Sequence, residues 1–495
     1  MVAPELRAAV QAAINQWSDT APSVSGTCAQ AQVSAQSPAA AAAALAGATT
    51  PTVWISDSPI WSAKLAAAAP GRVTPGPSVA TSPLVVAAAP AQADALNVAA
   101  RTGWSGVLGG STPVTVTDPA TTASGAMMTL AVKSQAGSAP GSAAALIGLF
   151  IRLQAALLPS SAAGFTALSA HPDRAPAFIT SEQAVLEANR AHGSVLARAI
   201  YPSGPTPVLN YTVARVASPD ADDSATAAAG LVEKALAAPT ARARFAALGL
   251  RGPDARPLSD IAKNSGIKAT TVKVASGTVT AADEAAVTRL WRAAAKPSRL
   301  LAVIDVSGSM ADPANAGGAP KIKVASAAAA SAIDVLPASW SVGLWSFSTK
   351  KPPATDWTEL VSTGSVRTQR STLEAAARSL PDRVNGDTAL YATVTAAFAE
   401  ASRHYDPKAV NVVALLTDGA NVDPRRNLDL PTLLAGLERD YDPNRPVHIV
   451  TIGFGRDADT EALKEISAAT DGQSYRVENP TDIRGVLLDS ILANN

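Results

Sequence analysis

The sequence predicts an α/β protein with more than one domain. Short apolar runs typical of strands alternate with helical stretches along most of the chain, which favours sheets covered by helices. The 495 residues are more than one hydrophobic core usually organises, so two or three domains are expected. The 40 basic and 40 acidic residues leave no net charge, and this balance disfavours nucleic acid and anionic membrane surfaces as partners.

The first block, from Pro4 to about Pro207, alternates helices and strands. Helices are expected over Pro4–Trp17 and Ala39–Ala46 and from near Ser124 onwards. Strands are expected at Ala29–Ala35, Val53–Ile55, Leu84–Ala88 and Val114–Thr117. Short strands separated by helices predict mostly parallel sheets here. Cys28, the single cysteine, is interpreted as a small buried strand residue.

The second block runs from Val208 to about Ala295. It opens with a strand over Val208–Val216, continues with a helical stretch over Ser224–Leu248, and ends in a helix over Ala281–Ala294. The sequence Lys296-Pro297-Ser298 then predicts a domain boundary.

The third block alternates regularly and predicts a doubly wound parallel sheet. The expected strands are Leu300–Val306, Ser341–Phe347, Asn411–Thr417, Val447–Gly453 and Ser474–Val477. The expected helices are Lys321–Leu336, Ser371–Leu380, Ala389–Arg403, Leu430–Tyr441, Thr460–Thr470 and Thr481–Leu492.

Oxygen-bearing side chains follow two of these strands and precede one helix. Asp305, Ser307 and Ser309 come after the strand that begins at Leu300; Thr388 precedes a helix, and Asp418 follows the strand that ends at Thr417. Ligands of open α/β sheets gather beyond the carboxyl ends of the strands, so these loops are expected to share one edge. Hydroxyl and carboxylate oxygens suit a hard dication, Mg²⁺ above all, with Mn²⁺ or Ca²⁺ as alternatives. The alternative interpretation is that Ser and Asp at strand ends only cap the next helix.

The ordered set of Asp305-Val306-Ser307-Gly308-Ser309, Thr388 and Thr417-Asp418-Gly419 resembles the von Willebrand factor A family at all five metal-site positions. The resemblance covers residues 297–495 and extends to Gly453-Phe454-Gly455. It implies a metal-ion-dependent adhesion site, in which a protein partner supplies an acidic residue that completes the coordination of the ion. A Gly/Pro/Asn loop, Ala311–Pro320, departs from the family pattern after the site.

The N-terminal region carries four short motifs in a fixed order: Val53-Trp54-Ile55-Ser56-Asp57-Ser58, Thr81-Ser82-Pro83, Asp118-Pro119 with Ser124-Gly125, and Thr180-Ser181-Glu182. Together these motifs resemble type II periplasmic solute-binding proteins. It implies a bilobed domain over residues 1–262, with one lobe of about 1–82 plus 206–262 and a second of about 83–205. Hinges are expected near Ser82-Pro83 and Pro207–Asn210. Residues 263–296 would connect this domain to the next.

A cleft between such lobes predicts a set of polar contacts: Ser56, Ser58, Ser82, Thr121, Thr122 and Ser124. Hydroxyls and helix N-termini suit a small polar or anionic solute. The alternative is that Asp118-Pro119 and Ser124-Gly125 are turn and cap residues. Trp54, Trp61 and Trp104 could line a sugar-like site, although core tryptophans are commoner.

Catalytic motifs are lacking in the sequence. It has neither a phosphate-binding Walker loop nor Gly-x-Ser-x-Gly, and its four histidines show no zinc spacing. The leading hypothesis is therefore a non-enzymatic binding or adhesion protein that engages a protein partner through a metal. The alternative is the solute receptor of a transport system, docked to other envelope components by its C-terminal domain.

The start of the chain bears on location. The first strand of the solute-binding family, expected before Pro4–Trp17, is missing, and the longest apolar run, Ala143–Ile151, is shorter than the roughly 20 residues that span a bilayer. We therefore expect an extracytoplasmic protein of the cell envelope, with a signal peptide or anchor removed upstream of residue 1. Contact with a membrane would occur only through that anchor.

Overall fold

The chain forms two compact units, residues 1–135 with 156–289 and residues 136–155 with 290–495. The computed structural model describes residues 1–47, 52–136, 142–154, 156–218, 221–257, 265–275, 280–314, 318–349, 355–423, 428–455 and 458–477. The helix expected over Thr481–Leu492 lies outside these residues. Among the described helices, none is long and apolar enough to cross a membrane.

The C-terminal unit is built on a six-stranded sheet in the order β11-β10-β9-β12-β13-β14. The strands are β9 (Ser298–Asp305), β10 (Ser341–Phe347), β11 (Trp357–Ser365), β12 (Val410–Thr417), β13 (Val447–Phe454) and β14 (Ser474–Val477). All neighbours pair in parallel except β10 and β11. The doubly wound sheet is thus confirmed. The antiparallel edge strand β11 was missed because its Thr, Ser and Glu residues give it no apolar run.

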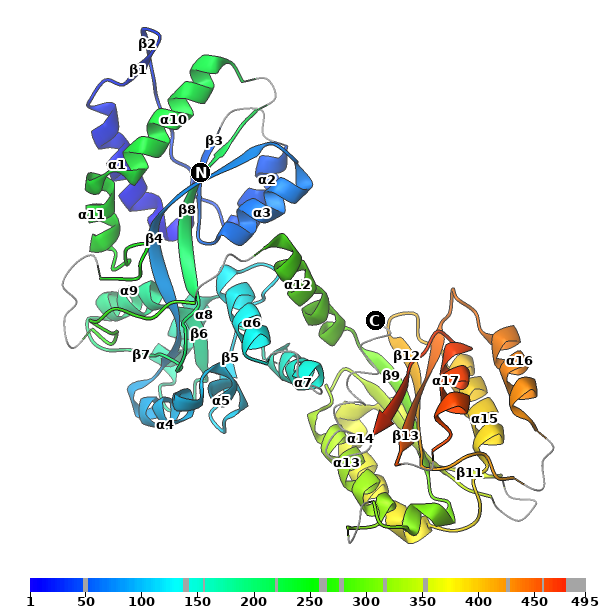
Figure 1. Cartoon of the computed structure of the whole chain (residues 1–495). Helices are drawn as coiled ribbons and strands as arrows, with labels where there is room; N and C mark the ends of the chain where they lie inside the picture. Colours follow the sequence, from blue (N-terminus) through cyan, green and yellow to red (C-terminus); the bar gives the residue numbers. More distant parts are fainter. Residues whose placement is uncertain are drawn as a thin grey trace. The chain divides into compact units, whose positions relative to one another are not determined.

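Helices cover both faces of this sheet (Figure 1). Leu301 and Val303 of β9 pack with α15 (Leu390–Arg403), α16 (Leu430–Asp440) and α17 (Thr460–Ala468). The alternate residues Leu300 and Ile304 face α13 (Lys321–Val335) and α14 (Val366–Arg378). A strand buried on both faces must be apolar at nearly every position, which explains why β9 and β12 were visible in the sequence.

The N-terminal unit holds a second sheet in the order β3-β8-β4-β6-β5, with β7 also pairing with β4. Its strands are β3 (Thr52–Ser56), β4 (Val73–Ala88), β5 (Val114–Thr115), β6 (Ala177–Ser181), β7 (Arg198–Ile200) and β8 (Val208–Val216). Of the pairs between these strands, only β5–β6 is parallel. The expectation of mostly parallel sheets is therefore wrong for this unit, because alternation of strands and helices does not fix strand direction.

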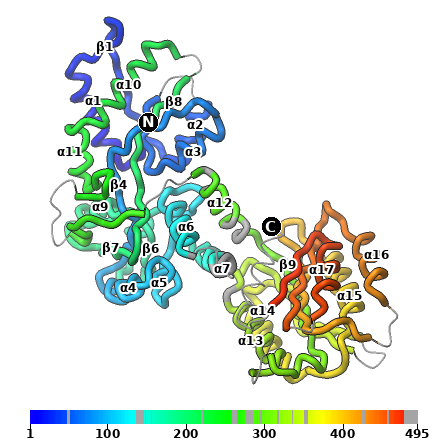
Figure 2. The backbone as a smooth tube through the Cα atoms, in the orientation of Figure 1, coloured from blue at the N-terminus to red at the C-terminus, as the bar shows by residue number. Residues whose placement is uncertain are grey.

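Strand β4 joins the two parts of the N-terminal sheet (Figure 2). Its first half pairs with β8 as far as Pro83, which lies opposite Val208. From Leu84 onwards it pairs with β6 instead. The return of Val208–Val216 to the first lobe is confirmed, since β8 also pairs with β3. Both expected hinges therefore lie in or beside paired strands and not in free loops.

Several helices of this unit pack against its strands. The helices of the unit are α1 (Arg7–Ser18), α2 (Pro38–Ala46), α3 (Pro59–Ala68), α4 (Ala93–Ala99), α5 (Trp104–Gly109), α6 (Ala123–Ala136), α8 (Ser161–Ala170), α9 (Glu182–His192), α10 (Asp223–Ala237) and α11 (Pro239–Ala247). Two more, α7 (Ser142–Gln154) and α12 (Ala281–Ala295), lie near the unit boundary in the sequence. The single helical stretch expected over Ser224–Leu248 is two helices, because Pro239 lacks the N–H that would continue the first. Trp54, Trp61 and Trp104 are buried core residues.

One expected strand is wrong. Ala29–Ala35 is not a strand; instead β1 (Ser23–Val24) and β2 (Thr27–Cys28) form a small hairpin. Ser25 and Gly26, with φ of 51° and 84°, make its turn, and Cys28 is exposed instead of buried. In the stretch that follows, the Ala29 N–H donates to the Pro22 carbonyl oxygen, and the Ser34 carbonyl oxygen accepts from the Val2 N–H.

Candidate functional site

The C-terminal sheet reverses its strand order between β9 and β12. These strands are neighbours, but the chain continues from them toward opposite edges of the sheet. Such a switch point leaves a crevice beyond the carboxyl ends of the two strands. Asp305 is the last residue of β9 and Asp418 directly follows β12, so both carboxylates stand at this crevice.

Asp305 is fully buried and held by two donors. Its Oδ1 accepts from the Ser307 N–H at 2.8 Å, and its Oδ2 accepts from the Thr417 hydroxyl at 2.5 Å. Burial raises the pKa of Asp305 to about 6; hydrogen bonds from Thr417 and Ser307 oppose the shift, while the Asp418 charge adds to it. The two donors fix the carboxylate in one orientation at the end of the strand.

Ser307 and Ser309 form the next layer of the site. Their hydroxyl oxygens lie 3.2 Å apart, and Ser309 donates to Asp418 Oδ1 at 2.8 Å. Mg²⁺ binds oxygens at about 2.0–2.1 Å in an octahedron, in which adjacent ligands are about 3 Å apart. The spacing of the two hydroxyls therefore fits neighbouring positions around such an ion.

Thr388 reaches the same place from a third loop. The Gly308 N–H donates to the Gly386 carbonyl at 2.9 Å, and the Val422 N–H donates to the Thr388 carbonyl at 2.8 Å. A methyl group built on Gly419 would lie 3.6 Å from the Thr388 hydroxyl oxygen. The structure thus brings together the loops that carry Asp305, Ser307, Ser309, Thr388 and Asp418.

The donor set is poor in charge and rich in hydroxyls. Among the described residues, no group of three His, Cys, Asp or Glu side chains could hold a metal ion. Two carboxylates and three hydroxyls suit Mg²⁺, which keeps several waters, better than a soft metal that needs thiolate or imidazole. The residues present therefore fit a hard dication with coordination positions left for an outside ligand.

Two contributors were not singled out from the sequence. Thr417, within the Thr-Asp-Gly triplet, orients Asp305. Lys321 is 5% exposed and places its ammonium group 2.7 Å from Asp418 Oδ2. A lysine opening a helix is ordinarily a solvated surface residue, so the sequence carried no signal for this ion pair.

The hydroxyls of the predicted solute contacts are hydrogen-bonded within their own loops or to the start of a neighbouring helix. Ser56 donates to the Ser58 carbonyl at 2.9 Å, and Ser58 caps α3. The Thr117 hydroxyl lies 2.7 Å from that of Thr122 and 3.1 Å from that of Ser124. Ser82 accepts from the Gln183 N–H at the start of α9, and Thr121 contacts the Asp118 carbonyl in its own turn. These hydroxyls therefore cap helices, stabilise turns, or, in the case of Ser82, connect β4 to the start of α9 by a hydrogen bond.

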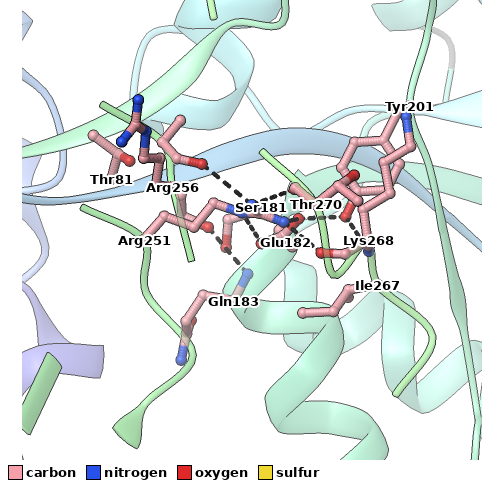
Figure 3. Close-up of polar contacts among 12 residues, drawn as sticks. Thr81, Ser181, Glu182, Gln183, Tyr201, Arg251, Arg256, Ile267, Lys268 and Thr270 are labelled. Atoms are coloured by element: carbon pink, nitrogen blue, oxygen red, sulfur yellow. Dashed lines mark hydrogen bonds and ion pairs between the residues drawn. The ribbon is translucent and has the colours of Figure 1, made fainter. Parts of the chain in front are cut away.

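A buried ion pair, which the sequence did not reveal, joins Arg251 to Glu182 at the start of α9 in the N-terminal unit (Figure 3). Arg251 and Glu182 are both 0% exposed and form two hydrogen bonds, at 2.7 and 2.9 Å. The remaining guanidinium donors reach carbonyls of Ala255, Lys268 and Thr270. Tyr201 donates to the same Glu182 carboxylate. Since every donor of the guanidinium is used, we interpret this network as structural.

Two stretches of the chain match known protein families. Residues 1–251 match the bacterial extracellular solute-binding proteins, and residues 300–488 match the von Willebrand factor type A domain. Two uncharacterized proteins of Mycobacterium tuberculosis, from two strains, are each 26% identical over 298 residues. That region is 59% of this chain and 41% of each relative, so the chain matches less than half the length of these relatives.

Solved structures similar to parts of the chain include a periplasmic binding protein and a pilus adhesin. The periplasmic binding protein P5PA is 10% identical over 58% of this chain and 95% of its own, with a TM-score of 0.39. The pilus adhesin SpaC of Lactobacillus rhamnosus GG is 17% identical over 40% of this chain and 31% of its own, with a TM-score of 0.32. The first family spans half of the sequence. The chain belongs to the bacterial extracellular solute-binding proteins and carries a von Willebrand factor type A domain after the solute-binding region.

Proposed function

We propose that this protein is a non-enzymatic, extracytoplasmic binding protein that engages a protein partner through a divalent ion in its C-terminal domain. The convergence of Asp305, Ser307, Ser309, Thr388 and Asp418 on one sheet edge is the observation that supports this most strongly. Location outside the cytoplasm is inferred from the family of the N-terminal region.

The side chains at this sheet edge would coordinate the ion in two ways. Hydroxyls of Ser307, Ser309 and Thr388 would bind it directly, and the carboxylates of Asp305 and Asp418 would bind directly or through water. The ion, when bound, acts as a Lewis acid that accepts a further oxygen ligand. Because most of these ligands are uncharged, an acidic side chain of a partner would be the favoured outside ligand.

Capture of partners in the presence and absence of chelator tests the proposal. The full chain, its Asp418→Ala variant and its Asp382→Asn variant are used as bait against an envelope extract, with Mg²⁺ or with EDTA. Asp382 is an exposed carboxylate of the same unit and serves as the matched control. We expect a partner that is lost with EDTA and with Asp418→Ala but retained by Asp382→Asn. A partner that binds equally in EDTA would contradict a metal-dependent contact.

Solute reception by the N-terminal region is the second candidate, favoured by its family match alone. Thermal-shift screening against anions, sugars and cationic solutes tests it. Ser82→Trp would place a large group beside the N-terminus of α9 and should abolish any shift. A solute that still stabilises this variant would rule out binding at that point.

A further inference from the structure

Lys321 occupies a position that helix energetics disfavour. It is the first residue of α13, where the aligned peptide dipoles repel a positive charge. Its side chain is nevertheless 7% exposed, although a lysine at a helix start can normally extend into water. An ammonium group in such a place requires a specific partner.

That partner is the metal-site carboxylate of Asp418. The Lys321 Nζ lies 2.7 Å from Oδ2 of Asp418, whose side chain is 0% exposed, and Ser309 donates to Oδ1. Both oxygens of Asp418 are therefore engaged by the protein itself. A buried carboxylate beside a second one, Asp305, is costly unless a positive charge compensates it.

We propose that Lys321 is a built-in counter-ion of the metal site, which weakens its affinity for a dication and raises the attraction of the ion-loaded site for an anionic ligand. This inference rests on the proposed metal site. The charges of two carboxylates and a dication cancel. With the ammonium group of Lys321 added, the ion-loaded site carries a net positive charge. That surplus favours an acidic partner and disfavours a neutral one.

Metal affinity of the full chain, measured with Mn²⁺ by calorimetry, tests the first half. We expect Lys321→Met to bind Mn²⁺ on the order of tenfold more tightly than the wild type, because a repelling charge is removed a few ångströms from the ion. Lys321→Arg keeps the charge and should stay close to the wild type. Lys323→Met removes an exposed lysine two residues along the same helix and should change nothing.

Equal or weaker binding by Lys321→Met would overturn the proposal, since Lys321 would then only support the structure. A wild type that binds no Mn²⁺ would instead refute the metal site on which the proposal rests. In EDTA, Lys321→Met leaves Asp418 buried without its counter-charge, so its Tm should fall by roughly 5 °C or more. Should this variant unfold in EDTA, saturating Mn²⁺ must restore its fold, and failure to do so would also overturn the proposal.

The second half is tested with glutarate as a probe on Mn²⁺-saturated protein, by the relaxation of water protons around the ion. We expect glutarate to bind several-fold more weakly to Lys321→Met than to the wild type and to Lys323→Met. Equal binding to all three would show that Lys321 does not bias the loaded site toward anions.

Discussion

Asp57 shows how burial and a neighbouring charge change a single residue. It follows Ser56 at the end of β3 and accepts from the Trp61 indole N–H at 2.9 Å. Burial first, and then the nearby Glu5 charge, raise the pKa of Asp57 from 3.8 to about 7.

A raised pKa means that protonation of Asp57 stabilises the folded chain. The stabilisation is complete below about pH 4 and is lost as the pH rises through about 7. We therefore expect the N-terminal unit to melt at a lower temperature at pH 8 than at pH 5, and Asp57→Asn to reduce this difference. Thermal melting of the wild type and of both variants at pH 5 and pH 8 measures this difference, and Asp254→Asn, a change at an exposed carboxylate, is the control. A difference that Asp57→Asn leaves unchanged would contradict the assignment.

The buried pair of Arg251 and Glu182 is expected to dominate the stability of its surroundings. Arg251→Met would leave the Glu182 carboxylate at 0% exposure without its cation, which costs about 3–5 kcal/mol. Arg256→Met removes a pair whose side chains are 74% and 59% exposed and should cost about 1 kcal/mol at most. Chemical denaturation compares the two variants. If both variants lose a similarly small free energy of unfolding, the buried network contributes little to stability.

At the scale of elements, the loop before Thr388 depends on one glycine. Gly386 has a φ of 70°, and a methyl group on it would lie 2.5 Å from the Thr349 carbonyl oxygen. Gly386→Ala should therefore displace the loop and weaken metal binding about tenfold or more, besides costing about 1 kcal/mol of stability. Gly436 lies within α16, and a methyl group built on it would meet no atom within 4 Å outside the backbone of its own helix. Gly436→Ala should therefore leave metal binding unchanged. Calorimetry compares the Mn²⁺ affinities of the two variants, and equal affinities would contradict a role of Gly386 in placing the loop.

Strands with a clear apolar pattern, either continuous as in β12 or alternating as in β8, were the most predictable from sequence. The strands β8, β10 and β14 were predicted with their observed bounds, and β9, β12 and β13 within two residues. The half-exposed β11 and the pairing of β4 with two different partners were not predictable, because neither leaves a local pattern. The residues of the candidate metal site followed from their order along the chain. The pairings of Lys321 and Arg251 could not be predicted, since each joins residues about 70 to 100 positions apart.

At the scale of the whole molecule, the two compact units predict two responses to metal. A ligand stabilises only the unit that binds it, by about 2.7 kcal/mol at a hundredfold excess over the dissociation constant. Calorimetric melting of the full chain should therefore show one transition that rises with Mg²⁺ and one that does not. A rise of the transition that belongs to residues 1–135 with 156–289 would place a metal site outside the C-terminal unit.

Anomalous diffraction from crystals of the full chain grown with Mn²⁺ tests the central claim most directly. We predict one strong peak within bonding distance of the Ser307 and Ser309 hydroxyls, beside Thr388, with Asp305 and Asp418 around it, and its loss in the Asp418→Ala variant. A peak bound by other residues, or no peak at this sheet edge at saturating Mn²⁺, would contradict the account.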